Sequence, residues 1–542
     1  MIKKKDAVIF QFNRLKNFMK IFLRNKLGAA GLIIILGFTF MALAAPVLTD
    51  KDPIYDVNLA ANKAAPIWIK YLPSFLGGKP GLSENFQAIQ DQTFEKGIEG
   101  WTSNTTSEHV KVQWQQHFGS DSKESMQIKF ERKETGVLYN ASEIKLNYTF
   151  KYPYQKGPAD FTLTFHLYIN GTITTITKKV PVEPVPGQLE WITINVSSFV
   201  VEPSINVYVE RLSDNRAWKI WPLQDMTKYE LYQNGTIKMQ TREWLKFYIG
   251  YADPLLKEVF RESPGEYVDP AKKLFKGAGD YRITFIVAFN DNKNATIPAE
   301  TSIFIDNVSF YCKGEAYGLL GTDDAGRDIF SQLVYGARIS LYVGVVSAVI
   351  SIVIGLLVGL AAGYLGRIVD EFLMRINDLL LVIPFLPLMI VLVTILGPSL
   401  ENLIILIGVL GWNSFARVVR SQVLSLKERA YIEAAKAAGA GTRHIIFRHI
   451  LPNVMSLVYV SLATSVPGAI TTEAALSFLG FSDPNRMSWG RILHSATRIG
   501  GGLLNWWWVV FPGLCIGLLA MAFILLGFAL DDILNPKLRV RR

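Results

Sequence analysis

Apolar stretches long enough to cross a membrane occur once near the start of the chain and repeatedly in its second half. A spanning helix needs roughly 20 mainly apolar residues. We predict spans at 27–46, 339–365, 379–396, 403–416, 454–469 and 509–530, of which 403–416 is short. An even number of crossings puts both ends of the chain on the same side of the membrane.

Lysine and arginine residues gather beside these stretches, in the segment 1–26, in the polar loop 417–452 and in the tail. Positive residues stay on the cytoplasmic side of membrane proteins, so we expect these three segments in the cytoplasm and residues after the first span outside. The long basic segment favours an uncleaved anchor over a cleaved signal peptide. Trp506, Trp507 and Trp508 precede the last span, and we expect their indoles in the outer headgroup layer.

Residues 47–312 follow a different pattern, in which apolar and polar residues alternate as in strands that bury one face. Asn170-Gly171 predicts a hairpin turn into the segment 172–177. Short strands with turn signals predict an extracellular β-sandwich with its core at about 87–311. The alternating apolar positions are Ile144, Leu146, Tyr148 and Phe150, then Phe161, Leu163, Phe165, Leu167 and Ile169, then Ile283, Phe285, Val287 and Phe289.

A more helical insert is expected at 243–275. Its aromatic and aliphatic side chains would pack on the sandwich or contact a partner. They are Trp244, Phe247, Tyr248, Leu255 and Phe260.

Composition agrees with apolar spans joined to a sizeable water-exposed domain, because 50% of residues are hydrophobic while 19% remain charged. The net charge of +10 does not indicate a nucleic-acid partner, since the basic residues lie beside apolar spans. Cys312 and Cys515 are the only cysteines, too few for a disulfide framework or a zinc site. The phosphate-binding pattern G-x-x-x-x-G-K-[ST] is absent, so we expect no ATP site in this chain.

The loop 417–452 contains the peptide EAAKAAG, from Glu433 to Gly439, followed by RHILPN, from Arg448 to Asn453. The alanines favour a helix, and Gly439 can end it in the left-handed conformation. A short exposed helix with small side chains suits a groove on another protein. Leu451-Pro452 opens the next apolar stretch.

These two peptides resemble the EAA loop of ABC-importer membrane subunits. From Gly318 onward the chain resembles the C-type permease subunit of dipeptide/oligopeptide ABC importers, which are binding-protein-dependent inner-membrane components. The departure is the long segment between the first two spans, where ordinary members have a short linker. The motifs are LGTDDAGRD (320–328), YGARISLYVG (335–344), WNSFARVVRSQVLSLKERAYIEAAKAAGA (412–440), RHILPN, EAALSFLGF (473–481), SWG (488–490) and FPG (511–513).

The resemblance implies a polytopic α-helical membrane protein of six transmembrane helices with the type I ABC importer permease fold, to which the strand pattern adds the mainly-β sandwich outside. It implies a five-helix permease core at 339–542, preceded by an interfacial elbow at 313–338. It also implies a second homologous permease, two ATPase subunits, an extracellular substrate-binding protein and membrane lipid as partners, with no nucleic acid.

The coupling role that the resemblance implies belongs to one set of residues in the loop. Glu433 would pair with a basic residue of an ATPase subunit. No catalytic, metal-binding or cofactor-binding residue is expected in this chain, because ATP and Mg would be bound and used by the partner ATPases. The residues expected to couple are Glu433, Ala434, Ala435, Gly439, Leu451 and Pro452.

Three polar or kinked features favour structural roles. Asp323, Asp324, Arg327 and Asp328 could suggest a metal or acid cluster, but they more simply make a capped turn into a helix. Glu473 falls near the outer end of its span, where we expect a local hydrogen bond. Pro384 and Pro387 would kink the span 379–396.

The substrate remains open between peptides, which the permease branch favours, and oligosaccharides. FEKGIEGWTS (94–103) and SIFIDNVSF (302–310) resemble the first and last strands of jelly-roll carbohydrate-binding modules. Trp191, Trp218 and Trp221 could stack on sugars or fill the core. A different class, a membrane-anchored carbohydrate-binding surface protein, would explain the outer domain but not the EAA loop or the extra spans.

Overall fold

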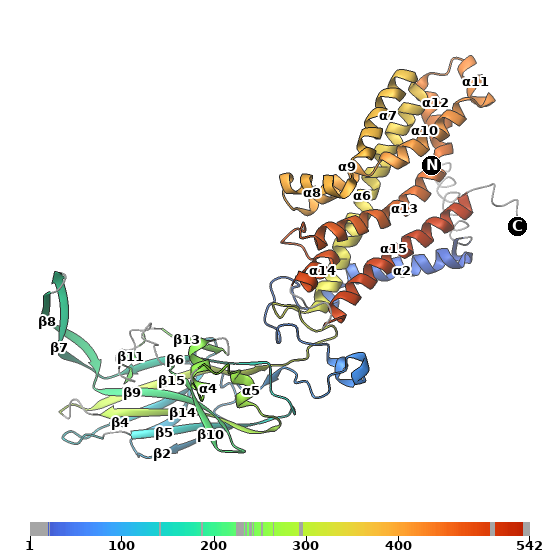
Figure 1. Cartoon of the computed structure of the whole chain (residues 1–542). Helices are drawn as coiled ribbons and strands as arrows, with labels where there is room; N and C mark the ends of the chain where they lie inside the picture. The colour runs from blue at the N-terminus through green and yellow to red at the C-terminus, as the bar shows by residue number, and fades with distance from the viewer. Residues whose placement is uncertain are drawn as a thin grey trace, which may run out of the picture. The chain divides into compact units, whose positions relative to one another are not determined.

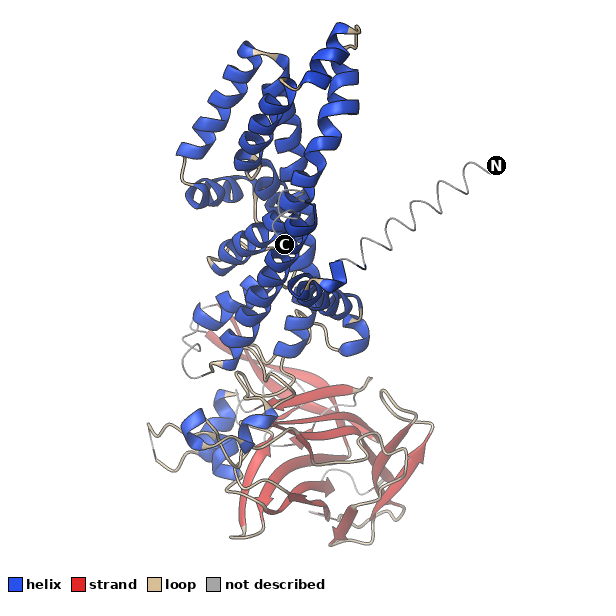
Figure 2. Ribbon diagram, turned by 90° about the vertical axis from the view of Figure 1, so that its right-hand side faces the viewer, coloured by secondary structure: helices blue, strands red, loops and turns tan. Residues whose placement is uncertain are grey.

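The computed structural model describes residues 20, 22–139, 142–185, 188–223, 232–233, 236–237, 241, 243–250, 253–263, 265–291, 296–498 and 505–534. The chain divides into two units, one formed by 1–63 with 318–542 and the other by Ala64–Tyr317. The first unit is helical and the second consists mainly of strands (Figures 1 and 2). Most of the basic segment predicted at 1–26 and the basic tail lie outside the described residues.

In the helical unit, five of the described helices are long and apolar enough to cross a membrane, and one bent pair would make a sixth span. The first is α2 (Lys26–Leu43) and the last is α15 (Trp507–Leu534). The other three are α6 (Ile329–Leu365), α9 (Leu400–Leu410) continued by α10 (Asn413–Lys427), and α12 (Thr442–Ile445) continued by η4 (Ile446–Ile450) and α13 (Leu451–Phe478).

The helix α6 is longer than the predicted span 339–365. It begins at Ile329, so residues 329–338 of the predicted elbow at 313–338 are helical. The carboxylate of Asp328 accepts hydrogen bonds from the backbone N–H groups of Phe330 at 3.3 Å and Ser331 at 3.1 Å, which caps the helix. The expected capped turn is therefore present, and it lies earlier than the apolar stretch alone indicated.

The kink predicted in the span 379–396 is a full break between two helices. Two helices, α7 (Arg367–Val382) and α8 (Phe385–Leu396), meet there at 91°. Proline lacks a backbone N–H and keeps the preceding residue out of the helical region. Ile383, which precedes Pro384, accordingly has φ −74° and ψ 127°, so the helix ends there rather than bending.

Close packing of α6 against α10 depends on small residues. A Cβ atom at Gly359 would lie 2.6 Å from Cβ of Val419, and one at Gly363 would lie 2.7 Å from Cβ of Val423. Larger residues at either position would force the two helices apart. A side-chain hydroxyl also joins α6 to α9, since Ser351 Oγ donates to the carbonyl oxygen of Gly408 at 2.9 Å.

The tryptophans before the last span do not all face the headgroup layer as predicted. Trp507 is 1% exposed and Trp508 is fully buried, while Trp506 is half-buried. Trp507 and Trp508 begin α15, which packs against α13, α2 and α14 (Trp489–Arg498). Burial by neighbouring helices, which the local sequence does not reveal, explains the difference.

The second unit is a sandwich of two antiparallel sheets with one hydrophobic core between them (Figure 1). One sheet has the order β13-β6-β15-β4-β3, with β1 paired to β15, and the other has the order β10-β9-β14-β5-β2. Two ribbons, β7 with β8 and β11 with β12, pair separately.

The strands of the first sheet and of the ribbons have these bounds: β1 Phe86–Gln87, β3 Val110–Gln116, β4 Glu124–Arg132, β6 Asp160–Gly171, β7 Ile173–Val185, β8 Gln188–Phe199, β11 Tyr232–Gln233, β12 Thr236–Ile237, β13 Leu245–Gly250 and β15 Ala299–Lys313. The second sheet consists of β2 Trp101–Thr105, β5 Ser142–Tyr152, β9 Val201–Arg211, β10 Arg216–Trp221 and β14 Gly279–Asp291.

The alternating residues predicted to share a buried face do so. All five apolar positions from Phe161 to Ile169 on β6 are at most 1% exposed, and the four on β14 are fully buried. On β5, Tyr148 alone of the predicted set is half-buried.

The predicted hairpin at Asn170-Gly171 is wrong. The chain continues from there into β7, but β7 pairs with β8 and not with β6. The neighbours of β6 are β13 and β15, which come much later in the sequence. Long-range pairing therefore overrides the turn signal.

The expected helical insert at 243–275 is only partly helical. It starts with the strand β13, because Leu245, Phe247 and Ile249 alternate with exposed residues. The short helices α4 (Pro254–Phe260) and α5 (Pro270–Leu274) follow. Phe247 and Phe260 pack into the core as predicted, whereas Tyr248 is 66% exposed.

The tryptophans considered for sugar stacking serve the core where the structure describes them. Trp221 is fully buried and packs edge-on against Phe165 at 5.1 Å. Trp218 stacks on Phe260 at 5.2 Å, with the guanidinium of Arg211 also 5.2 Å from its ring. The side chain of Trp191 lies outside the described residues.

Both connections of the sandwich leave from neighbouring points. β1 pairs with the end of β15, with Phe86 opposite Cys312, and Ala65 forms a bridge with Ala316. In the helical unit the same two chain segments also run together, because the N–H of Leu59 donates to the carbonyl of Gly326 at 2.9 Å.

The buried ion pair of Arg132 and Asp291 gives a stability prediction. Both side chains are fully buried and lie 3.0 Å apart. In the isolated segment 64–317, Asp291→Ala should lower the free energy of unfolding by about 3–5 kcal/mol, because it leaves a buried charge without its carboxylate. Glu262→Ala, which removes an exposed partner of Arg216 at 3.3 Å, should change it by less than about 1 kcal/mol.

Denaturant unfolding followed by tryptophan fluorescence measures both variants. A native segment without a cooperative transition would contradict the independent fold, and equal losses in the two variants would contradict the role given to the buried pair.

Candidate functional site

The loop predicted to couple to a partner forms a short helix, α11 (Ala430–Ala437), after α10. Its single buried residue, Ile432, is fully buried in a cluster with Leu426, Ile445 and Ile450. On the other faces of the helix Glu433, Ala434 and Ala437 are exposed, and Lys436, one turn after Ile432, is exposed as well. One apolar anchor thus holds the helix on the permease and leaves its small-residue face accessible.

Gly439 ends this helix as predicted, with φ +82°. The N–H of Gly439 donates to the carbonyl of Lys436 at 2.9 Å, and the N–H of Ala440 donates to that of Ala435 at 3.0 Å. The second bond and the left-handed glycine are those of a Schellman motif. The turn reverses the chain toward α12, and it depends on a residue without a Cβ atom.

Leu451 and Pro452 begin α13, the apolar stretch that the sequence indicated, but the helical path that leads into it already starts at Thr442. The path passes through η4, a π-helical turn in which the N–H of Leu451 donates to the carbonyl of Ile446. Pro452 cannot donate to the carbonyl of Arg448. A widened turn at this point accommodates the missing bond, and such turns recur at functional positions.

The predicted coupling residues are thereby placed on two short segments. Glu433, Ala434 and Gly439 are exposed and Ala435 is half-buried. Leu451 is half-buried against the cluster of Ile432, while Pro452 is exposed. The sequence analysis did not predict that Ile432 anchors the helix. The available signal was its position, as a single aliphatic residue between Tyr431 and the EAA sequence.

Two ion pairs join α7 to α10. Arg420 Nε and Nη2 donate to the two oxygens of Asp370 at 2.5 and 2.6 Å, a bidentate arrangement, and Arg417 pairs with Asp378. In the sequence, these arginines indicated only that their loop lies on the cytoplasmic side of the membrane. Their carboxylate partners hold α7 against α10 just before the 91° break in the chain.

A pocket of about 350 Å³ lies where the break between α7 and α8 meets the junction of α9 and α10. Leu380, Ile383 and Pro384 line it from one side, and Leu410 and Asn413 from the other. Asn377, fully buried, donates from Nδ2 to the carbonyl of Asn413 at 3.0 Å and so ties the two breaks together. The sequence did not indicate this pocket, because its walls come from separate helices.

Asp323 and Asp328, which precede α6, have structural partners. Asp323 is 2% exposed and accepts hydrogen bonds from the N–H groups of Ala325 at 2.8 Å and Arg327 at 2.9 Å, and from Gln332 Nε2 at 2.7 Å. Burial raises the pKa of Asp328, against the hydrogen bonds from Ser331. In the part of the chain that the structure describes, no group of three or more His, Cys, Asp or Glu residues could hold a metal ion.

Glu473 makes the local hydrogen bond that we expected. It lies near the end of α13, 1% exposed, and accepts from Ser477 Oγ at 2.6 Å. This bond joins positions four apart on one helix and supports a structural role.

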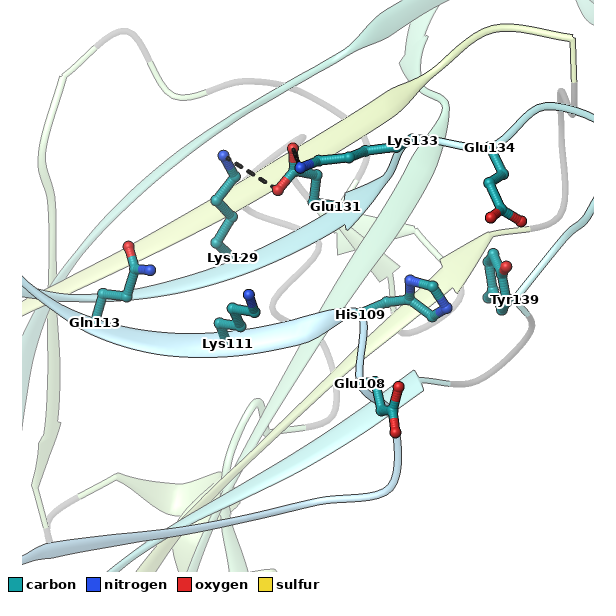
Figure 3. A pocket seen from close by; sticks show the side chains of 9 residues that line it. All are labelled: Glu108, His109, Lys111, Gln113, Lys129, Glu131, Lys133, Glu134 and Tyr139. Carbon is teal, nitrogen blue, oxygen red and sulfur yellow. Dashed lines mark ion pairs between the residues drawn. The ribbon is translucent and has the colours of Figure 1, made fainter.

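A second pocket of about 350 Å³ lies on the sandwich around β3 and β4 (Figure 3). Three lysines and three glutamates line it together with Gln113, His109 and Tyr139. The ring centroids of His109 and Tyr139 are 3.8 Å apart. Lys129 and Lys133 both lie near Glu131, at 3.9 and 3.7 Å. Its charges balance and most of its side chains are exposed, so we assign no ligand to it.

Two protein families match separate parts of the chain. Residues 351–540 match the binding-protein-dependent transport system inner membrane component, and residues 13–66 match the N-terminal TM domain of oligopeptide transport permease C. Neither match includes the strands of the sandwich.

Similar proteins cover the permease part. The dipeptide transport system permease protein DppC of Bacillus subtilis is 43% identical over 222 residues, which are 40% of this chain and 68% of that protein. The oligopeptide transport system permease protein OppC of the same organism is 42% identical over 224 residues, 40% of this chain and 72% of that protein.

Two solved structures show weaker likeness. An inward-facing MetNI methionine ABC transporter is 23% identical over 38% of this chain and 96% of that chain, with a TM-score of 0.32. TmCBM61 in complex with beta-1,4-galactotriose is 10% identical over 42% of this chain and 99% of that chain, with a TM-score of 0.21. Neither likeness is strong enough to support a functional argument.

The family assignment therefore depends on the sequence relatives, which share more than two thirds of their length with this chain, together with the multi-pass helical unit. The chain belongs to the inner membrane components of binding-protein-dependent transport systems, as a C-type permease subunit of the dipeptide and oligopeptide branch.

Proposed function

We propose that this chain is the transmembrane subunit of an ABC importer that takes up dipeptides or oligopeptides. The observation that carries the proposal is the identity of 42–43% to relatives named dipeptide and oligopeptide transport permeases. No similarity of comparable strength favours oligosaccharide uptake or a membrane-anchored carbohydrate-binding protein. The test is ATP-dependent uptake of labelled peptide by the reconstituted complex; uptake of oligosaccharides but not peptides would overturn the substrate assignment.

Partner subunits supply what this chain lacks. A second permease would complete the pathway, two ATPase subunits would bind ATP and Mg, and an external binding protein would deliver the substrate. Family membership supports this general assembly. Copurification with the tagged chain identifies the partners.

The exposed face of α11 is the proposed contact with an ATPase subunit. Its small residues, Ala434 and Ala437, allow close approach, and Glu433 offers a charge to a basic residue. The buried Ile432 and the cluster around it connect movement of α11 to α10 and α13. Closure of the ATPases would thus be transmitted as a movement of whole helices.

The proposed orientation places α11 in the cytoplasm and the sandwich outside. Its support is the distribution of basic residues, which are frequent in the loop 417–452 and the two ends of the chain.

The conformation of Gly439 allows a matched test of coupling. Gly439 has φ +82° and Gly441 has φ −70°, and a Cβ atom would meet nothing within 4 Å at either position. Gly439→Ala should cost roughly 1–2 kcal/mol in the left-handed conformation, and coupled peptide uptake should fall by up to about 5- to 30-fold. Gly441→Ala should leave uptake near the native rate.

Uptake and ATP hydrolysis are measured together in proteoliposomes at equal amounts of assembled complex. Retained uptake in Gly439→Ala, or the same loss in both variants, would count against this turn as the coupling element. Glu433→Lys tests the proposed contact itself and should reduce uptake relative to ATP hydrolysis.

A labelling experiment tests the orientation. Single cysteines replace Lys436 and Asn170, which are both exposed, after Cys312 and Cys515 are changed to alanine. A membrane-impermeant maleimide added to intact cells should label position 170 and not position 436, while both react after the membrane is opened. Labelling of position 436 from outside would reverse the proposed orientation.

A further inference from the structure

We propose that the first loop of the sandwich unit, residues 67–80, rests on the membrane and places the rings of Tyr71 and Phe75 among the lipid headgroups. We call this segment the aromatic loop. The inference goes beyond the proposed function and does not depend on the transported substrate. It begins from two large side chains that the rest of the protein leaves uncovered.

The aromatic loop exposes two rings to solvent. Tyr71 is 82% exposed and Phe75 is 85% exposed. Every other phenylalanine that the structure describes in Ala64–Tyr317 is buried or half-buried. Burial favours such a side chain over exposure roughly 10- to 100-fold. Two exposed rings on one loop therefore indicate a surface outside this chain that covers them.

The backbone of the aromatic loop holds the rings outward. Two 3₁₀ turns form it, η1 (Ile67–Tyr71) and η2 (Ser74–Leu76). Ile69, on η1, is fully buried and anchors the loop on the sandwich unit. Where the loop closes, a Cβ atom at Gly78 would lie 1.8 Å from the carbonyl oxygen of Leu72. The rings are thus presented by a closed and anchored turn rather than by an extended linker.

A short length of chain ties the aromatic loop to the membrane helices. The N–H of Lys63 donates to the carbonyl of Asp323 at 2.8 Å, and the carboxylate of Asp323 accepts from Gln332, in the first turn of α6, at 2.7 Å. Ile67 follows four residues after Lys63, which is at most about 14 Å. The turn η1 adds about 8 Å up to Tyr71. Whatever the orientation of the sandwich, Tyr71 stays within about 22 Å of Lys63.

The edge of the apolar layer lies within that reach. The helix α2 has 18 residues and is about 27 Å long, close to the thickness of the hydrocarbon core. Where α2 ends, the guanidinium of Arg338 on α6 donates to the carbonyls of Ala42 and Leu43. A charged group at this level marks the boundary of the lipid. Gln332 lies six residues before Arg338, about 9 Å along the axis of α6.

The composition of the aromatic loop selects a lipid surface. Tyrosine and tryptophan gather at the membrane interface, where the ring enters the headgroup layer and the polar group stays wet. Residues 67–80 contain two lysines and no acidic residue. One of them, Lys79, is exposed beside the rings. Lipid phosphates would therefore attract this segment rather than repel it.

Fluorescence quenching tests the contact in the full chain with its copurified partner subunits. Phe75→Cys is introduced after Cys312 and Cys515 are replaced, and it is labelled with a small fluorophore. The protein is reconstituted in vesicles of phosphatidylethanolamine and phosphatidylglycerol, without the external binding protein. Iodide in the water should quench this label about tenfold less than a label at Ile173→Cys. Lipids that carry a doxyl group near the headgroup should quench the label at position 75 and not the label at position 173.

Ile173→Cys is the matched control at the other end of the sandwich. Ile173 is 49% exposed and follows Gly171, the last residue of β6. The first residue of β6, Asp160, pairs with Lys313, at the end where the chain leaves the sandwich. The 12 residues of β6 separate the two ends by about 36 Å.

Two further variants assign the effect to the rings of the loop. In the protein labelled at position 75, Tyr71→Ser should raise iodide quenching toward the level found at position 173, because one of the two inserted rings is lost. Tyr248→Ser, at a tyrosine of β13 that is 66% exposed, should leave the quenching unchanged. If Phe75→Cys fails to assemble, a label at Ser74→Cys, which is exposed on the same turn, decides.

The inference is overturned by equal iodide quenching at positions 75 and 173, or by the absence of quenching from doxyl lipids at position 75. Protection from iodide that arises only after the external binding protein is added would assign the loop to a protein contact and would also overturn it. Neither measurement requires peptide uptake, so a failure of the proposed function would be seen separately, in the uptake assay.

Discussion

Inside a bilayer every backbone N–H and C=O group needs a partner from the protein itself, since no water is present to supply one. This requirement limits where the membrane helices of this chain can be interrupted. The abrupt interruption at Ile383–Pro384 lies opposite the α9–α10 junction, and Asn377 connects the two through the carbonyl of Asn413. The third irregularity, the π-turn before Leu451, lies next to the apolar cluster that holds α11. The irregular backbone is thus grouped at the pocket between the two breaks and at the proposed coupling loop.

The sequence predicted those parts of the structure that depend on local pattern. Apolar length located the membrane helices, alternation identified the buried face of β6, and alanines followed by Gly439 predicted α11 and its end. These features need only neighbouring residues, because helix propensity, strand alternation and a left-handed glycine act over a few positions.

The misses share a different physical origin. Asn170-Gly171 resembles a hairpin turn, yet the partners of β6 are β13 and β15. Trp507 and Trp508 resemble an interfacial belt, yet neighbouring helices bury them. In the site, Ile432 and the pair Asn377–Asn413 depend on contacts between separate helices. Tertiary packing decides such features, and the pattern of neighbouring residues in one sequence does not predict which distant residues will be in contact.

The chain enters and leaves the sandwich through adjacent segments. β1 lies beside the end of β15, and Ala65 forms a bridge with Ala316. Closing a flexible loop costs entropy that grows with the logarithm of its length. In a folded domain whose ends lie side by side, this entropy has already been lost when the domain folds. The domain therefore connects the two membrane helices in the same way as a short loop. The membrane core could therefore have gained the domain, and could exchange it for another with adjoining ends, without any change in how its own helices pack.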